Sequence, residues 1–522
     1  MQQANANSTE TAVTKTGTEH KTNNVMKTKN INVMSFTVLL TVSILLTACS
    51  GDDAGGSERS ATPETLQPQT YELTIGAIKR VDNDPQSAAM RRALSESGKI
   101  INVTWSEGDE VSVYNVTKGQ VLDGKLTAQD GGNLSTTLKG KLTGSIDAGD
   151  VLRFSYKSPA YDNQQPTLQY IADNCDYALV EATVTAIDAG VLNLNSNNVE
   201  FVSQQAIVRF TFNATGVDGP RVSQMKVIVD GKTYTTQKDE SFASSVLYVA
   251  IPSFSGRRIS LLATLNGNDY KFTKENVTFE NGTYYRINVT VSPLKNVSQA
   301  AVEDKNKFIG TDGHIYESKD EASYFGTTAC ATIVYVGSAG AVDASSDTYK
   351  GLAMALEGTS GSTVEKWGHQ AEAVDISEHT TLASAQTDMA GIGNTSKLVE
   401  EYGTKENYVA RILLEFRSSN PHPEGTSDWF IASCGQWVLL LNDNDAGITT
   451  DNTWENAPFT LSKDFSSIYN FSPNEIHWTS TEYDTERAVY IQFPGSSQAT
   501  VFYIGKELSS TANGTLRPFL AF

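Results

Sequence analysis

The sequence predicts a mainly β protein, in which two β-sandwich domains are followed by an α+β domain. From residue 71 onward, short runs alternate apolar and polar residues, as strands with one buried face do, and turns rich in Gly, Asp and Asn separate these runs. After about residue 307, apolar residues also recur at the three- and four-residue spacing of helices. The length of 522 residues leaves room for about two to four domains of ordinary size.

Residues 70–200 are expected to form the first sandwich. Its first strand, Tyr71–Ile75, places apolar side chains at every second position. Further short β-rich runs follow at 100–105, 111–114, 121–126, 134–138 and 151–156. Turns at this spacing are typical of a sandwich of short antiparallel strands.

Residues 201–295 are expected to form the second sandwich. Its opening and closing strands each place four apolar residues on one face: Ala206, Val208, Phe210 and Phe212, and Tyr285, Ile287, Val289 and Val291. Asp230-Gly231 and Asn281-Gly282 are typical of two-residue hairpin turns. Strands of this kind bury one face and leave the other in water.

Residues 1–48 are expected to be a leader and lipoprotein signal peptide. Two lysines precede an apolar run, Phe36–Ala48, and small residues lead into Cys49, which is the order found in secretory signals. The run is shorter than the ~20 residues that a membrane-spanning helix needs. Leu46–Cys49 resembles the bacterial lipobox, which implies that Cys49 carries a lipid and that residues 49–69 form a polar tether. The alternatives are an ordinary signal peptide with an incidental cysteine, or a buried core helix.

Composition limits the partners and the redox chemistry of the chain. The formal net charge of −20 opposes binding to nucleic acid and favours solubility. With Cys49 assigned to lipid, Cys175, Cys330 and Cys434 remain. We expect free buried thiols, while a Cys330–Cys434 disulfide is the alternative outside the cytoplasm. No CxxC or HExxH motif occurs and the six histidines are scattered, so the sequence indicates no metal, cofactor or catalytic site.

Residues 296–306 are expected to form a linker, and residues 307–522 an α+β domain. Two sets of apolar residues at helical spacing predict helices: Leu352, Ala355 and Leu356, and Tyr408, Ile412 and Phe416. The stretch Ser433–Gln436 fits a capping box, which predicts that a helix begins there. Strand-like runs return after residue 476 and end in an apolar strand at Phe519–Phe522.

Three stretches of the first two domains resemble the fimbrillin-like (Mfa-like) lipoproteins of the Bacteroidales. Thr104–Tyr114, TWSEGDEVSVY, resembles the W-x-x-G-D-x-(I/V)-x-V-Y signature of that family. Asp176–Val180 and Gln205–Phe210 resemble two further family segments, with Gln205 where histidine is usual. The resemblance covers about residues 70–295, and it implies two transthyretin-like sandwiches in a subunit of a type V pilus.

The same resemblance implies how the subunit would meet its partners, the other pilus subunits. In the family, an arginine-specific protease removes the first strand after export, and a strand donated by the next subunit fills the groove. In this chain the removed strand would be Tyr71–Ala77, and Arg80, Arg91 or Arg92 would be the cleavage site. Arg91-Arg92 is preferred because it lies in a polar segment just before the next strand. A solvated loop that is never cut is the alternative.

Ordered segments across Phe308–Phe522 resemble the C-type-lectin-like domains of Bacteroidetes surface proteins, of the Fibrobacter succinogenes major paralogous kind. The more specific ones are Trp478–Glu482 (WTSTE) and Arg517–Phe522 (RPFLAF). The Trp-Asn-Asp signature of calcium-dependent lectins is not reproduced, so the resemblance carries over no calcium site. Trp437 and Trp478 are expected in the core rather than as platforms for a ligand.

Together these features predict a lipid-anchored, surface-exposed lipoprotein of the outer membrane, belonging to a type V pilus and presenting its lectin-like domain to an unknown glycan or protein ligand. The apolar strand Phe519–Phe522 fits a core strand that is unavailable for donation, which predicts a tip or accessory position. A non-polymerising lipoprotein that captures glycan or protein ligands is the alternative. An enzyme such as a glycosidase ranks last, because no acid/base pair stands out.

Overall fold

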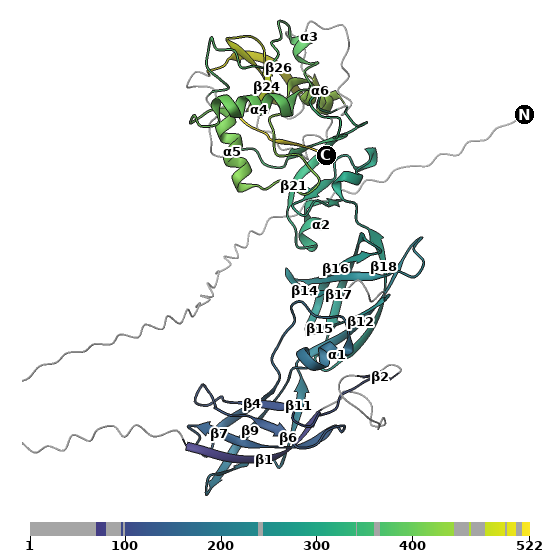
Figure 1. Ribbon diagram of the computed structural model, residues 1–522, viewed down its shortest axis with the longest axis vertical. Helices are drawn as coiled ribbons and strands as arrows, with labels where there is room; N and C mark the ends of the chain where they lie inside the picture. The colour runs from purple at the N-terminus through teal and green to yellow at the C-terminus, as the bar shows by residue number, and fades with distance from the viewer. Residues whose placement is uncertain are drawn as a thin grey trace, which may run out of the picture. The chain divides into compact units, whose positions relative to one another are not determined.

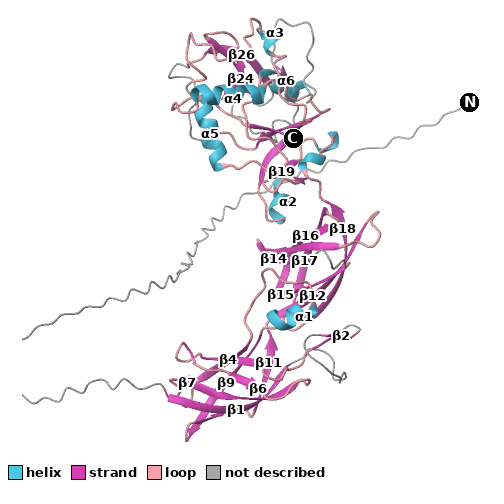
Figure 2. Ribbon diagram, viewed as in Figure 1, coloured by secondary structure: helices cyan, strands magenta, loops and turns pink. Residues whose placement is uncertain are grey.

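The computed structural model describes residues 69–79, 95–97, 100–237, 244–340, 342–359, 366–442, 459–460, 475–495, 498–507 and 514–522. Strands dominate these residues, and most of the helices lie toward the C-terminus, which confirms the mainly β fold predicted from the sequence (Figure 2). Cys49, Arg80, Arg91 and Arg92 lie outside the described residues, together with the rest of the signal peptide and most of the tether.

The first sandwich is a sheet that closes on itself (Figure 1). Its described strands are β1 (Gln69–Lys79), β4 (Glu110–Asn115), β5 (Gln120–Val121), β6 (Leu126–Ala128), β7 (Ser135–Gly144), β8 (Val151–Tyr156), β9 (Ala178–Asp188), β10 (Val191–Leu194) and β11 (Asn198–Ser203). They run in the order β10-β1-β11-β9-β8-β4-β6-β7, and β7 then pairs with β1. The pairing of β5 with β4 lies off this path.

The interior of this sandwich is filled by alternate residues of its strands, because successive side chains of a strand point to opposite faces. Trp105, Phe154 and Phe201 are at most 1% exposed, and the rings of Tyr156 and Phe201 meet Trp105 edge-on. A separate ribbon joins β2 (Ser95–Ser97) to β3 (Ile100–Asn102), and the short helices α1 (Leu168–Tyr170) and η1 (Ile171–Cys175) connect β8 to β9.

The second sandwich contains a sheet in the order β14-β13-β16-β17-β18-β12-β15. The strands are β12 (Gln205–Ala214), β13 (Val222–Val229), β14 (Lys232–Gln237), β15 (Val246–Pro252), β16 (Phe254–Leu265), β17 (Asn268–Phe279) and β18 (Tyr284–Pro293). The four residues predicted on the inner face of the opening strand, from Ala206 to Phe212, are all at most 1% exposed. In the closing strand, Val289 and Val291 are buried, while Tyr285 and Ile287 are only partly buried against the same core.

The C-terminal domain combines two sheets with helices, as an α+β domain does. One sheet has the order β20-β19-β21-β22-β28, with β19 (Phe308–Gly310), β20 (Ile315–Tyr316), β21 (Ala329–Val336), β22 (Gly351–Ala355) and β28 (Phe519–Ala521). The other has the order β23-β26-β25-β24-β27, with β23 (Phe459–Thr460), β24 (Glu475–Glu482), β25 (Arg487–Gly495), β26 (Gln498–Gly505) and β27 (Gly514–Thr515). The described helices are α2 (Lys319–Tyr324), α3 (Leu382–Ala385), α4 (Gly391–Tyr402), α5 (Val409–Ser419) and α6 (Cys434–Asn442).

Two predicted helices of this domain have different outcomes. The set from Tyr408 to Phe416 coincides with α5, whose Ile412 is buried, so that prediction is confirmed. Gly351–Ala355 forms β22 instead of a helix, because it lies between β21 and β28 and buries all five residues. A short, continuous apolar run has no period that separates a doubly buried strand from a helix, and this is why the sequence misled.

Only one of the two hydrogen bonds of the capping box predicted at the start of α6 is formed. The Gln436 side chain does accept a hydrogen bond from the Ser433 backbone N–H, at 2.9 Å. The Ser433 hydroxyl, however, donates to the backbone carbonyl of Asp388 at 2.6 Å. The Ser433 hydroxyl is thus bonded to a residue distant in sequence instead of to the first turn of the helix.

The segment for which the sequence predicts a linker, residues 296–306, contains two short turns of 3₁₀ helix, η2 (Val297–Gln299) and η3 (Val302–Asp304). Val297 and Ala300 are at most 3% exposed and pack into a core cluster of the C-terminal domain. The carboxylate of Asp304 pairs with Lys295 and Lys307 at 2.7 and 3.1 Å. These residues therefore fold with that domain.

The cysteines that the structure describes, Cys175, Cys330 and Cys434, are free thiols, which confirms that expectation over the disulfide alternative. Cys175 and Cys434 are buried as expected, whereas Cys330 is only partly buried. Burial raises the pKa of Cys330 to about 12 and that of Cys175 to about 11, which keeps both protonated at neutral pH. A search of the described residues finds no helix long and apolar enough to span a membrane.

Candidate functional site

The strand β1 is hydrogen-bonded along both of its edges. On one side it pairs antiparallel with β7, from Gln69 opposite Gly144 to Ile78 opposite Ser135. On the other side it runs parallel to β11, and Glu72 pairs with β10. Removing β1 would leave unpaired backbone groups on both neighbouring strands, which is the condition for accepting another strand.

The inward face of β1 is apolar and fully buried. Tyr71, Leu73, Ile75 and Ala77 are between 0 and 4% exposed, whereas Ile78 on the outward face is 39% exposed. Burying a side chain of this size stabilises a fold by about 1.5–3 kcal/mol. Most of what holds β1 in place is therefore this row of alternate side chains together with its two hydrogen-bonded edges.

A close approach on the β11 side explains the glycine of β1. A Cβ atom added to Gly76 would lie 1.8 Å from the side-chain oxygen of Asn198 and 3.2 Å from the backbone oxygen of Asn197. Gly76 also donates its N–H to Asn197 at 3.0 Å. A side chain at this position therefore fits only if the Asn198 side chain moves away.

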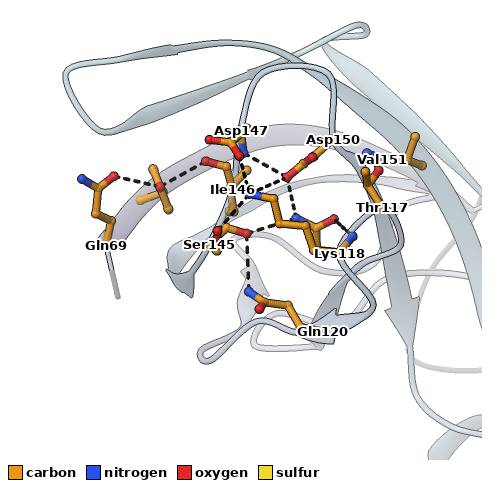
Figure 3. Close-up of polar contacts among 11 residues, drawn as sticks. Gln69, Thr117, Lys118, Gln120, Ser145, Ile146, Asp147, Asp150 and Val151 are labelled. Carbon is orange, nitrogen blue, oxygen red and sulfur yellow. Dashed lines mark hydrogen bonds and ion pairs between the residues drawn. The ribbon is translucent and has the colours of Figure 1, made fainter. Parts of the chain in front are cut away.

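At its N-terminal end, β1 is fixed by the hydroxyl of Tyr71, which donates to the backbone carbonyl of Ile146 at 3.2 Å. The loop that carries Ile146 is braced by the buried carboxylate of Asp150. Asp150 accepts hydrogen bonds from the Asn115 amide at 2.7 Å and from the Asp147 N–H at 2.9 Å, and Lys118 lies beside it (Figure 3). Burial alone would raise the pKa of Asp150, but these donors outweigh it and lower that pKa.

At the other end of β1, the alternation places a charged residue inside the sandwich. Lys79 is 4% exposed, and its ammonium donates to the Thr104 carbonyl at 3.2 Å and to the Asp176 carboxylate at 3.3 Å. The Asp109 carboxylate lies 4.0 Å away. Burial lowers the pKa of Lys79, and the two carboxylates oppose that change.

Two aromatic rings complete the surroundings of the Lys79 ammonium. Its nitrogen lies 3.8 Å from the ring centre of Tyr156 and 4.6 Å from that of Trp105, within the range of cation–π attraction. Trp105 and Asp109 belong to the first fimbrillin-like motif of the sequence and Asp176 to the second. The fold thus brings both motifs together around one lysine.

Lys79 is not among the site residues predicted from the sequence. Its candidate residues, Cys49, Arg80, Arg91 and Arg92, lie outside the described residues, and Arg80 directly follows the last residue of β1. The available signal was a lysine at the next inward position after Tyr71, Leu73, Ile75 and Ala77. The prediction ended the strand at Ala77 and so missed it.

The WTSTE motif of the C-terminal domain forms a buried polar network. Trp367 donates its ring N–H to the Thr479 carbonyl at 2.7 Å, and the Thr481 hydroxyl donates to the Asp388 carboxylate at 2.6 Å. Glu482 forms an ion pair with Lys506, and both side chains are 0% exposed. Burial raises the pKa of Glu482, although the Lys506 ammonium opposes it.

Trp437 and Trp478 are at most 1% exposed, which confirms their predicted place in the core. Within the described residues, no group of three or more His, Cys, Asp or Glu side chains is arranged to hold a metal ion. In this domain Trp437, Trp478 and the WTSTE residues thus belong to the interior.

Comparison with known proteins gives a limited result. No family model matches the chain. No curated protein matches it significantly. Among solved structures, a fimbrial protein from Bacteroides ovatus is 14% identical, with 87% of this chain and 100% of that chain covered, at a TM-score of 0.29.

Two further structures show the range of the similarity. A candidate cell adhesion protein from Bacteroides uniformis is 13% identical, covering 42% of this chain and 93% of its own, at a TM-score of 0.24. The shaft pilin SpaA from Lactobacillus rhamnosus GG is 10% identical, covering 44% of this chain and 99% of its own, at a TM-score of 0.19. Because all three TM-scores lie below 0.5, the fold described above rests on this chain's own strand pairings.

Proposed function

We propose that this protein is a surface lipoprotein of a type V pilus that gives up β1 and receives a strand from another pilus subunit. The observation that carries the proposal is the place of β1 in the first sandwich: it is bonded on both edges, and it buries one apolar face. Its loss would leave a groove with unpaired backbone groups and exposed apolar side chains. A donated strand with the same alternation would satisfy both.

The position of the arginines supports the same proposal. Arg80, Arg91 and Arg92 all lie between the end of β1 at Lys79 and the start of β2 at Ser95. A cut at any of them separates β1 from the rest of the sandwich, and also separates Cys49 from it. Cleavage would therefore release the subunit from its own anchor at the moment when the groove becomes available.

An arginine-specific protease tests this step. We expect it to trim the exported protein to a discrete core that begins after Arg80 or Arg92, and we expect this core to assemble with other pilus subunits. A variant with Arg80, Arg91 and Arg92 all changed to alanine should remain untrimmed and fail to assemble. If that variant assembles normally, strand removal at these arginines is wrong.

The proposed anchor is a lipid on Cys49. Metabolic labelling with a palmitate analogue should mark the protein, and Cys49→Ala should abolish the label because no thiol remains for acylation. Labelling of the alanine variant at the level of the unaltered protein would contradict the anchor.

Within the pilus we propose a tip or accessory position, with the lectin-like domain acting as an adhesin for a glycan or protein ligand. The support is that β28 is built into the core of that domain, so Phe519–Ala521 is not a strand that this protein can donate. Immunogold labelling of residues 307–522 should mark one end of each filament. Regular labelling along the shaft would contradict the tip position, and labelling of isolated surface protein only would favour ligand capture without polymerisation.

A further inference from the structure

The inward face of β1 ends at a buried cation, and the groups around this cation are called its pocket here. Lys79 occupies the last inward position of the strand and is 4% exposed. An ammonium group is kept in such a place only when nearby groups compensate for the water that it has lost. Here the compensating groups are two carboxylates, one backbone carbonyl and two aromatic rings.

All of these groups belong to the part of the sandwich that would remain after β1 leaves. Asp176 Oδ2 lies 3.3 Å and Asp109 Oδ2 lies 4.0 Å from the ammonium nitrogen. The Asp109 carboxylate is fixed in place, because it accepts the Ser106 N–H at 2.8 Å. Without β1, two largely buried carboxylates would face the end of the groove without the cation that now lies between them.

Among the described residues that line this region, Lys157 is the other cation, and its ammonium is directed elsewhere. Lys157 borders the same small cavity beside Lys79, and its ammonium donates to the backbone carbonyl of Asp173. The cavity measures about 30 Å³, which is enough for a water molecule, and Lys79 borders it. Arginine, which carries the same charge on a larger head group, is therefore tested beside lysine.

We propose that this pocket selects the replacement strand by charge: the donated segment of another subunit must carry lysine or arginine at the position of Lys79. The inference rests on the proposed strand exchange and names the chemistry of the partner. Over its whole length the groove accepts a tyrosine at position 71, apolar residues at 73 and 75, glycine and alanine at 76 and 77, and a basic residue at 79. A purely apolar strand of the same alternation is rejected, because it leaves the Asp176 and Asp109 charges buried and unpaired.

The experiment uses the purified chain with residues 84–90 replaced by the site of a sequence-specific protease that does not cut at arginine. After cleavage, the protein is mixed with a fluorescent peptide of residues 69–79, QTYELTIGAIK. Anisotropy then measures competition by the unlabelled peptide and by its Lys79→Arg, Lys79→Met and Lys79→Glu forms. Methionine keeps an unbranched apolar stem close to that of lysine and removes the ammonium group with its charge and its hydrogen bonds.

We expect the arginine peptide to compete within about threefold of the lysine peptide. The methionine peptide should be about 100-fold weaker, as follows when one partner of a buried ion pair is removed, and the glutamate peptide weaker still. A methionine peptide that competes within threefold of the lysine peptide overturns the inference.

A second arm changes the groove instead of the strand. In an Asp176→Asn protein the preference for lysine over methionine should fall by at least about tenfold. The control is Asp147→Asn, an exposed carboxylate at the far end of β1, which should leave the preference unchanged. Thermal melting of the uncut variants verifies that both fold. An unchanged preference in a folded Asp176→Asn protein also overturns the inference.

The outcomes separate this inference from the proposed function. If not even the unaltered peptide enters the cut protein, strand exchange itself is wrong and the charge selection falls with it. If peptides exchange without regard to residue 79, strand exchange stands and only the charge selection is wrong.

Discussion

The strands β1 and β28 are buried in opposite ways. Along β1, buried and exposed residues alternate, so that one face is packed and the other is largely in water. In β28 all three residues are buried, and they divide between two cores: Phe519 and Ala521 pack in one cluster and Leu520 in the other. Both strands lie in sheets. Of the two, β1 has a largely exposed face whose residues can vary with little effect on packing.

This difference teaches which strand a protein can exchange. A strand with one wet face can be replaced by any segment that repeats its inward pattern, because the outward residues are hardly constrained. A strand between two cores must fill the space on both of its faces with side chains of the right size. Its loss would expose apolar side chains in both cores. We therefore expect changes in β28 to unfold the C-terminal domain and changes in β1 to act on the first sandwich alone.

The largest effect is expected at β28. Phe519→Ala should lower the free energy of unfolding of the C-terminal domain by about 3–5 kcal/mol, because it opens a cavity beside Trp437, whose ring centre lies 5.0 Å away. Urea unfolding followed by tryptophan fluorescence measures this. The control Val302→Ala, at a side chain that is 70% exposed, should change the value by no more than about 0.5 kcal/mol. Equal effects of the two changes would contradict the core role of β28.

A similar loss of unfolding free energy is expected when the buried ion pair between Lys506 and Glu482 is broken. In β1 the comparable interaction is that of Lys79 with Asp176. Lys506→Met should cost about 3 kcal/mol, because Glu482 would stay buried without its cation. Adding Glu482→Leu should recover much of the loss. If the double variant is no more stable than Lys506→Met in chemical denaturation, the unpaired charge of Glu482 is not the cause of the loss.

Two isoleucines test the two faces of β1. Ile75→Ala, at a 3% exposed side chain, should destabilise the first sandwich by at least about 2 kcal/mol. Ile78→Ala, on the outer face and 39% exposed, should cost no more than about 1 kcal/mol. Hydrogen exchange of the β7 amides reports both changes. A larger effect at Ile78 would reverse the faces assigned here.

A smaller effect is expected from pH at His314 of the C-terminal domain. Burial alone would lower the pKa of His314, but the hydrogen bond to Asp269 and the nearby Asp312 carboxylate, 3.3 Å from Nδ1, outweigh it and raise the pKa to about 9. Because the folded pKa exceeds the ordinary 6.5, the stabilisation is complete below about pH 6.5 and is lost as the pH rises through 9.

The measurement is the melting temperature between pH 6 and pH 10, compared with that of a His314→Gln variant. The unaltered protein should lose more stability over this interval than the variant does. Parallel curves for the two proteins would mean that His314 does not carry the pH dependence.

The smallest effect is expected on the wet face of β1. Glu72 lies directly opposite Lys141 of β7, with 3.2 Å between the charged atoms and both side chains more than half exposed. Glu72→Ala should cost only about 0.2–1 kcal/mol, and this difference should shrink in high salt. A loss larger than that of Ile75→Ala would mean that the outer face constrains the strand after all.

The sequence predicted β1, β4, β8 and the opening and closing strands of the second sandwich, because their signal is local. It did not predict β9, β10 or β11, and its run 121–126 divides between β5 and β6. Tyr71, Leu73 and Ile75 alternate with polar neighbours, and an alternation of two can only be a strand with one buried face. The helix α5 was found for the same reason, at a spacing of three and four. Gly351–Ala355 was not, since a strand buried on both faces has no such period.

What the sequence by itself determined is thus the period of each element and the class of fold that these periods build. What only the tertiary structure decided is which elements meet. Lys79 and Asp176 are separated by 97 positions in the chain, yet their side chains form one ion pair, and Trp105 and Asp109 of a third segment close around it. The alternation of β1 does not indicate that Lys79, at its last inward position, is paired with buried carboxylates. This arrangement results from long-range strand pairing, which depends on burial and hydrogen bonding across the whole closed sheet and leaves no local pattern.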